Sequence, residues 1–165
     1  MSARSFAGLI ADIELGKESL QRILQHQVEV FAWVGDESNF FRTSAAGVVL
    51  HDFYNAVEKT FQQIALEVDG GLPLGDAWHQ QLLWRMTVAV PARRPAVIDS
   101  ELAQSLAEYL RFRHLFHHIY GFDLDWERIE PLLVAVPATH AALIAQIERF
   151  TAFLTTLERD LSEAG

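Results

Sequence analysis

The stretch 44–68, SAAGVVLHDFYNAVEKTFQQIALEV, decides the fold class. Large apolar residues recur in it every three or four positions: Val49, Phe53, Val57, Phe61, Ile64, Ala65 and Val68. This spacing places them on one face of an α-helix and does not fit the alternation of a half-buried strand. Asp69-Gly70-Gly71 and then Pro73 follow, which predicts that the helix ends there.

The same helical spacing extends along most of the chain, and no internal repeat interrupts it. A first helix is expected from Phe6 to near Gly35. A third helix is expected from the N-cap candidate Asp76 to Met86. A fourth is expected from Asp99 or Ser100 to about Tyr120, where Gly121 ends it. Asp125 is expected to cap a short turn from Trp126, and the final helix, kinked or broken near Pro131 and Pro137, reaches about Leu161. These lengths predict an all-α fold: an antiparallel four- to five-helix bundle that forms a single domain over residues 1–165.

Composition limits the class of protein. The chain has 165 residues, of which 50% are hydrophobic, so one sizeable core can form. It has no cysteine, which excludes disulfides and thiolate chemistry and is compatible with a reducing compartment. No segment resembles a signal peptide, and no apolar run approaches the roughly 20 residues that span a bilayer. We therefore expect a cytoplasmic protein without membrane contact.

Charge is distributed unevenly. The formal net charge of −9 argues against non-specific nucleic-acid binding and against a DNA partner. However, residues 85–120 hold five arginines and three acids, which gives this window a charge of about +2 while the remainder carries about −11. We expect any polyanion to bind in this window.

A cluster of polar side chains stands out on the fourth predicted helix: Arg113, His114, His117, His118 and Tyr120. On a helical wheel these residues share one side, and the apolar Phe112, Leu115, Phe116 and Ile119 take the other, which is expected to face the core. Three chemical interpretations remain open for the polar side. It is a solvated surface, a metal site, or a site for phosphodiester chemistry.

The metal interpretation has little support. His114 and His118 have the i, i+4 spacing of a zinc-binding pair, but zinc usually takes three or four protein ligands, and no carboxylate shares their face. The His51-Asp52 pair on the second helix also lacks the further ligands that a metal phosphohydrolase needs. We expect neither metal nor cofactor.

Phosphodiester chemistry without metal fits the residue types better. An imidazole exchanges protons near neutral pH, and a guanidinium holds phosphate and stabilises developing charge. Arg113 and His118 differ by about 140° around the helix, so they cannot aim at one point within a single chain. We therefore expect a composite site in a homodimer.

The pattern Arg113-x4-His118-x-Tyr120 resembles the R-x4-H-x-Y motif of HepT toxins, within the HEPN superfamily of helical ribonucleases. The segment from Phe53 to Glu58, the Trp78-His79 pair and the segment from Gly121 to Trp126 are also similar, and the resemblance runs from about Leu20 to Leu157. It implies a metal-independent endoribonuclease toxin that acts as a homodimer on RNA. It also implies a minimal nucleotidyltransferase as antitoxin, which attaches AMP to Tyr120.

Matching positions give the residues their expected roles. Arg113 would bind and polarise phosphate, His118 would be the acid/base group, and His114 would assist it. The candidate RNA contacts are Arg111, His117, Arg93 and Arg94. His117 is a rival to His118, because it lies nearer to Arg113 on the wheel.

Other interpretations stay open beside the toxin. Tyr54, Asn55 and Glu58 form a polar strip on the second helix, which is interpreted as a solvated face or as the source of an interhelical hydrogen bond. The functional alternative is that the strip supports the site residues, with Glu58 paired to a basic residue of the fourth helix. At the level of function, the alternative to a nuclease is a non-catalytic helical module that pairs with a nucleotidyltransferase and binds nucleotide or RNA. A plain dimerisation domain is the third possibility.

Overall fold

The computed structural model describes residues 5–33, 39–118 and 123–165, which form an all-helical bundle. The elements are α1 (Ala7–Ala32), α2 (Phe40–Ile64) with its π-helical continuation η1 (Ala65–Asp69), α3 (Trp78–Arg85), α4 (Ser100–His118) and α5 (Trp126–Glu163). Within these ranges there is no β-strand, only an isolated bridge between Val90 and Arg94. The expected all-α bundle of four to five helices is confirmed, and it has five.

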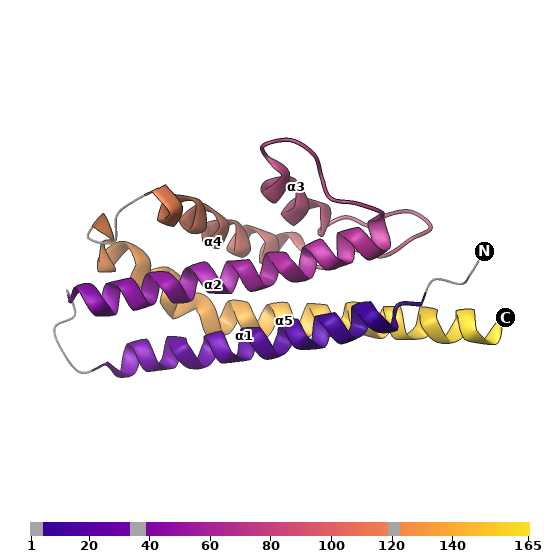
Figure 1. Ribbon diagram of the computed structural model, residues 1–165, viewed down its shortest axis with the longest axis horizontal. Helices are drawn as coiled ribbons and strands as arrows, with labels where there is room; N and C mark the ends of the chain where they lie inside the picture. The colour runs from indigo at the N-terminus through magenta and orange to yellow at the C-terminus, as the bar shows by residue number, and fades with distance from the viewer. Residues whose placement is uncertain (1–4, 34–38, 119–122) are drawn as a thin grey trace.

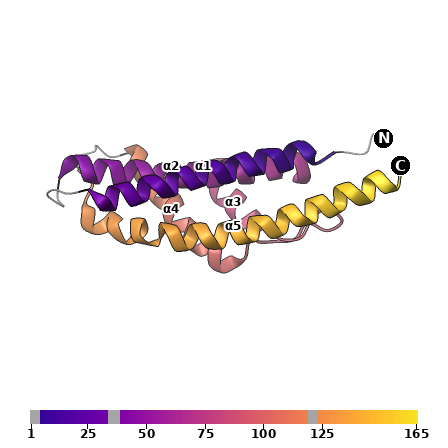
Figure 2. The same ribbon diagram turned by 90° about the horizontal axis from the view of Figure 1, so that it is seen from below.

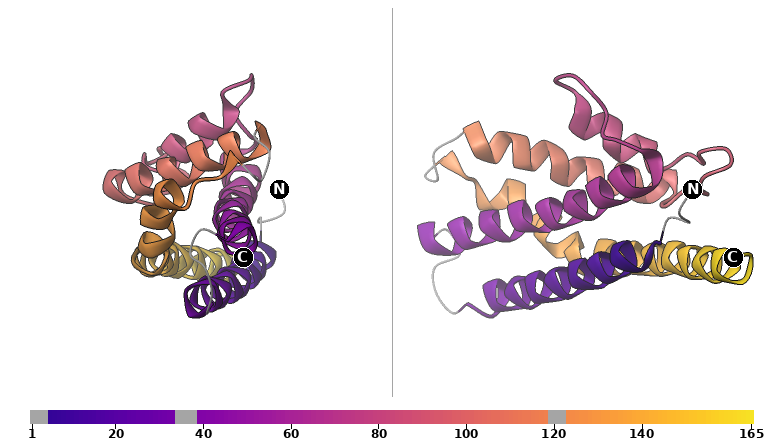
Figure 3. Two further views of the ribbon diagram at one scale, coloured as in Figure 1. Left: turned by 90° about the vertical axis from the view of Figure 1, so that its left-hand side faces the viewer. Right: turned by 45° about the vertical axis from the view of Figure 1, so that its right-hand side comes forward.

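The four long helices run alternately in opposite directions, and the short α3 lies beside α2 and α4 (Figure 1). Seen from below, α5 extends along the same length as α1 (Figure 2). Viewed towards one end of the bundle, α2 lies between α1 and α4 (Figure 3). The central helix therefore contacts every other helix and carries the core.

The apolar stripe of the second helix is buried along its whole length: Val49, Phe53, Val57, Phe61, Ile64, Ala65 and Val68 all lie in the core. The helix ends as expected, because Gly70 adopts a positive φ of 88° that a residue with a side chain rarely adopts. Its start differs from the expectation of Ser44. Asn39 caps the helix by accepting a hydrogen bond from the backbone N–H of Phe41 (2.7 Å), so α2 begins at Phe40.

The other predicted helix starts gave mixed results. Asp99 is confirmed as a cap of α4, since its carboxylate accepts a hydrogen bond from the backbone N–H of Leu102 (2.8 Å). Asp125 likewise caps α5 through the N–H of Glu127. Asp76 does not cap α3; the N-cap is Ala77, which makes no side-chain cap. The predicted end of the fourth helix at Tyr120 and Gly121 lies outside the described residues.

The predicted break in the last helix is wrong, because α5 continues through both Pro131 and Pro137. A proline removes the hydrogen bond to the carbonyl four residues earlier, which for Pro137 is the carbonyl of Leu133. The structure gives this carbonyl another donor, the buried Gln27 side chain of α1 (3.0 Å). The Tyr109 hydroxyl of α4 donates to the preceding carbonyl, that of Leu132 (2.8 Å). A neighbouring helix thus supplies the hydrogen bond that Pro137 cannot give.

Among the described residues, α5 is also the one helix long and apolar enough to cross a membrane by length and composition. It packs against α1, α2 and α4 in the bundle. Its buried residues recur with helical spacing along the side that faces these helices: Trp126, Ile129, Leu133, Val136, Leu143, Ile147, Phe150 and Leu154. We therefore assign α5 as a core helix of the bundle.

Candidate functional site

A pocket of about 880 Å³ lies between α2, α3 and α4 and is lined by four of the eight predicted site residues, Arg111, Arg113, His114 and His117. Its lining is Asn55, Glu58, Asp76, Ala77, His79, Gln80, Leu110, Arg111, Arg113, His114 and His117. The size suits a nucleotide-sized ligand. The structure therefore brings two guanidinium groups and three imidazoles to one concave surface within a single chain.

Arg113 is buried, although the helical wheel placed it on the solvent face. Its Nη1 donates to Glu58 Oε1 and to Asn55 Oδ1 (3.0 Å each), and its Nη2 donates to Glu58 Oε2 (3.0 Å). The guanidinium also lies 4.9 Å from the centre of the Tyr54 ring. Arg113 thus continues the inward face of α4, where α2 supplies a counter-charge.

The same rotation of α4 exposes Leu115, which the wheel had assigned to the core; its exposed fraction is 49%. Phe112 is buried as expected, and Phe116 is half-buried against the core. The wheel sorted residues by polarity alone. It did not take into account the carboxylate of Glu58 on the facing helix, which holds the guanidinium of Arg113 inside.

Glu58 is the acidic centre of the pocket floor and is only 4% exposed. Of the interpretations left open for it, the interhelical pair with a basic residue of the fourth helix is confirmed by its two-pronged contact with Arg113. Burial, followed by the negative charge of Glu58, raises the pKa of the neighbouring Tyr54 phenol. Tyr54 therefore stays protonated across the physiological range.

His79 is the residue that sequence reasoning missed. It lies in the first turn of α3, and its Nδ1 is 2.8 Å from Glu58 Oε2 and 3.0 Å from Arg113 Nη2. Its ring lies against that of Trp78, with centroids 3.7 Å apart. The pair Trp78-His79 was noticed only as part of a family resemblance, because a single histidine outside the cluster gave no spacing signal.

His117 faces another helix. Its Nε2 is 3.2 Å from Nε2 of His51 on α2, and the Nδ1 of His51 is 3.3 Å from Asp52 Oδ1. Partial desolvation, and then the neighbouring His51 and Arg113, lowers the pKa of His117. The His51-Asp52 pair, read from sequence as a surface feature, therefore lies next to the site.

His114 and His118 lie one turn apart on the exposed side of α4, with ring centroids 4.7 Å apart. His114 lines the pocket, whereas His118 is not part of its lining. Within the described ranges, no group of three or more histidine, aspartate or glutamate side chains is arranged to hold a metal ion. Tyr120, the predicted modification site, lies outside the described residues.

The remaining candidate RNA contacts differ in their environment. Arg111 is exposed, pairs with Glu108 one turn earlier and lines the pocket. Arg93 is exposed in the loop before α4, where its Nη1 donates to the Val68 carbonyl (3.2 Å).

Arg94 has a different role from the one expected. It is buried, with its side chain fully covered, and it forms a two-pronged ion pair with Asp69 (2.7 and 2.8 Å). It also donates to the carbonyls of Val88 and Pro95. The expectation that Arg94 contacts RNA at the rim is wrong: it fixes the loop onto the end of η1.

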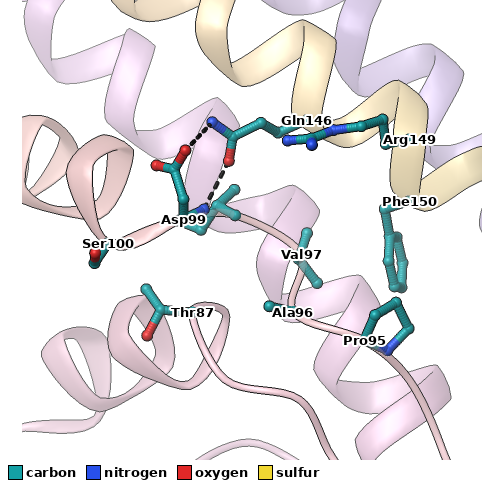
Figure 4. Close-up of a pocket in the computed structure, with 10 residues that line it drawn as sticks. Thr87, Pro95, Ala96, Val97, Asp99, Ser100, Gln146, Arg149 and Phe150 are labelled. Carbon is teal, nitrogen blue, oxygen red and sulfur yellow. Dashed lines mark hydrogen bonds between the residues drawn. The ribbon is translucent and has the colours of Figure 1, made fainter.

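A second pocket, of about 540 Å³, lies between α5 and the segment before α4 (Figure 4). Asp99 and Gln146 line it and hydrogen-bond to each other, the Gln146 amide donating to Asp99 Oδ2 and its Oε1 accepting from the Asp99 N–H. Arg149 is its one cationic side chain, and no histidine lines it. The chemistry for proton transfer is therefore concentrated in the pocket around Arg113.

Comparison with known proteins agrees with this geometry. Residues 45–154, about two thirds of the chain, match the sequence model of a family described as HepT-like protein. The matched segment contains most of α2, all of α3 and α4 and most of α5, and it includes every residue that lines the pocket. No curated protein and no solved structure matches the chain. The match over most of its length shows that this chain belongs to the HepT-like family.

Proposed function

We propose that the protein is the toxin of a toxin–antitoxin pair and cleaves RNA without a metal ion. Its family indicates a HEPN-type toxin–antitoxin component. The observation that carries the catalytic part of the proposal is the pocket in which Arg113 meets the imidazoles of His79, His114 and His117. Imidazoles supply the proton acceptor and donor that phosphodiester cleavage needs, and no redox group or nucleophilic thiol is required.

The active form in this proposal is a homodimer. His118 projects from the exposed side of α4, outside the pocket lining, while the motif arginine points inward to Glu58. A second protomer that packs on the exposed side of α4 would bring its own His118 to a neighbouring pocket. The exposed Leu115 on this helix supports such packing, because it offers an apolar contact between His114 and His118.

Regulation in this proposal acts at Tyr120, two residues beyond the last described residue of α4. A nucleotidyltransferase antitoxin would attach AMP to its hydroxyl. The adduct adds bulk and negative charge two positions after His118 in the motif, so it would compete with an RNA phosphate. The partner and the cytoplasmic location belong to the same proposal.

One observation favours a second candidate, a non-catalytic module that binds nucleotide or RNA. Glu58 and Asn55 engage both terminal nitrogens of Arg113, which leaves the guanidinium less able to grip a phosphate. In a nuclease, Arg113 then contributes by its charge and by ordering the pocket. In the alternative, it is a structural ion pair.

Cleavage of RNA in EDTA tests the proposal. We expect the purified protein to cut single-stranded RNA, and His118→Ala to reduce the rate by at least about 100-fold, the usual contribution of an acid/base group. Arg113→Lys is the matched test of the guanidinium, since it keeps a cation next to Glu58. Binding without cleavage would favour the non-catalytic module.

Two further comparisons refine the assignment. A greater loss of activity in His117→Ala than in His118→Ala would transfer the motif role to His117. After co-expression with a nucleotidyltransferase, a mass increase of one or more AMP units that Tyr120→Phe abolishes would identify the regulatory residue.

A further inference from the structure

His79 has a setting that no other histidine of the pocket shares. Its Nδ1 lies 2.8 Å from the buried carboxylate of Glu58. His114 and His117, the other two histidines in the lining, have no carboxylate on a ring nitrogen among the described residues; His117 faces the imidazole of His51. A carboxylate on one ring nitrogen fixes the tautomer of a histidine and stabilises its protonated form.

The tautomer follows from the donors and acceptors around Nδ1. Arg113 Nη2, 3.0 Å away, can only donate, and Glu58 Oε2 accepts when ionised. Nδ1 therefore has two options: to accept from Arg113 or to donate to Glu58. The shorter contact and the negative charge favour donation to Glu58, which leaves Nε2 with its lone pair.

Nε2 of His79 is the free nitrogen of this arrangement. None of the described residues forms a hydrogen bond to it, and the side chain, 37% exposed, lines the pocket that also contains Arg113. The stacked Trp78 ring holds the imidazole from one side. One hydrogen-bonded unit is thus formed by Glu58 of α2, His79 of α3 and Arg113 of α4. The Nε2 nitrogen of His79 in this unit is accessible to a ligand.

We propose that His79 is the general base of RNA cleavage and that Glu58 positions it. The inference rests on the proposed nuclease function and adds a residue outside the R-x4-H-x-Y motif. One motif histidine cannot both accept and donate a proton in the same step, so a metal-independent cleavage needs a second group.

Neutral Nε2 of His79 accepts the proton of a ribose 2′-hydroxyl while the 2′-oxygen forms a bond to phosphorus. The bond from phosphorus to the 5′-oxygen breaks, and this oxygen takes a proton from the imidazolium of His118. The products are a 2′,3′-cyclic phosphate and a 5′-hydroxyl. The two histidines have exchanged protonation states, which exchange with solvent restores.

His79→Asn is the decisive variant. The asparagine amide can occupy the place of Nδ1–H and donate to Glu58, so the ion-paired floor is retained and Nε2 alone is lost. Each variant is assayed on RNA and on uridine 3′-(4-nitrophenyl phosphate), whose leaving group needs no proton. His26→Asn, an exposed histidine on α1 outside this pocket, is the matched control.

We expect His79→Asn to lower kcat at least about 100-fold on both substrates and to remove the rise of kcat/KM with pH on the acidic side, because a base is missing. His118→Asn should be slow on RNA and recover on the activated ester. The midpoint of thermal unfolding of His79→Asn should stay close to that of the wild type.

Two results would overturn the assignment while leaving the nuclease function intact. Wild-type rates in His79→Asn would show that this histidine takes no part. Recovery of His79→Asn on the activated ester would make it the acid and not the base. If the wild-type protein cleaves neither substrate, the proposed function itself is refuted, and His79 with it.

Discussion

The buried pair of Glu58 and Arg113 allows a quantitative prediction. Their side chains are 5% and 9% exposed, and two contacts of 3.0 Å join them. Replacing Glu58 by methionine, which has a similar volume, leaves the guanidinium buried without a counter-charge. Removing one partner of a buried ion pair typically costs about 3–5 kcal/mol, so we expect a loss of about 4 kcal/mol in the free energy of unfolding.

A double-mutant cycle tests this value. Arg113→Met should cost a similar amount, since it leaves the Glu58 carboxylate buried with only His79 and a weak contact from Gln62 (3.4 Å). The double variant Glu58→Met/Arg113→Met should be more stable than either single variant, because no buried charge is left unpaired.

Urea denaturation followed by far-ultraviolet circular dichroism gives the free energies. For a chain of this length, a loss of about 4 kcal/mol corresponds to a fall of about 8–16 °C in Tm. Single variants that each cost less than about 1 kcal/mol and whose effects simply add would refute the reasoning, because exposed pairs behave in that way.

Three other predictions concern stability. Arg94→Ala should lower the free energy of unfolding by about 3–5 kcal/mol, because it breaks the buried pair with Asp69. The control Arg93→Ala should change it by less than about 1 kcal/mol. Equal effects of the two variants in urea denaturation would contradict the burial of Arg94. Gln27→Leu should cost about 1–3 kcal/mol in the free energy of unfolding, because it leaves the buried carbonyl of Leu133 without a donor. Adding Pro137→Ala should remove most of this cost, because it restores a backbone N–H. An undiminished cost in the double variant would refute the role given to Gln27. Burial lowers the pKa of His140 in the folded protein. As the pH falls below about 6.5, this histidine is therefore protonated in the unfolded chain before it is protonated in the folded one. The free energy of unfolding should decrease below that pH by at most about 1.4 kcal/mol per pH unit. His140→Leu should flatten this part of the stability profile, and an unchanged profile would contradict the burial.

The sequence was sufficient for the helices because their apolar stripes are long and regular. The second helix illustrates this, since every member of its predicted stripe is buried. Its first turn was missed because Phe40 and Phe41 are exposed and add nothing to the stripe, while the cap is a single asparagine. The continuity of α5 depends on Gln27, which lies 106 positions away from the carbonyl that it satisfies. Contacts over such separations leave no local pattern.

The sequence placed most of the site on one helix, where the cluster on α4 was recognised from its composition. It also left open that Glu58 pairs with a basic residue of that helix, whereas His79 entered the site only through folding. A polarity wheel assumes that charged residues face solvent. That assumption fails for Arg113 because α2 presents Glu58 and Asn55 at the same level. The same assumption misplaced Arg94, whose partner Asp69 lies 25 positions away.

The charges of the pocket lead to a last prediction, on pH. The fixed charges of the lining cancel, since Arg111 and Arg113 are balanced by Glu58 and Asp76. Additional attraction for a phosphate must then come from the imidazoles of the lining, and the titration of His117 is the one that its surroundings shift. Desolvation and the neighbouring His51 and Arg113 lower the pKa of His117, so this side chain gains its charge only at acidic pH.

We therefore expect the affinity for a 2′-O-methyl oligonucleotide, which lacks the attacking hydroxyl, to increase as the pH falls from 8 to 5.5 at constant ionic strength. Each proton taken up on binding contributes up to about tenfold per pH unit. Fluorescence anisotropy measures the Kd. His117→Gln should reduce the pH dependence at its acidic end, because the lowered pKa of His117 places its protonation there, whereas His26→Gln should not. A Kd that is independent of pH would mean that the arginines alone hold the phosphate, and that Glu58 releases Arg113 when RNA binds.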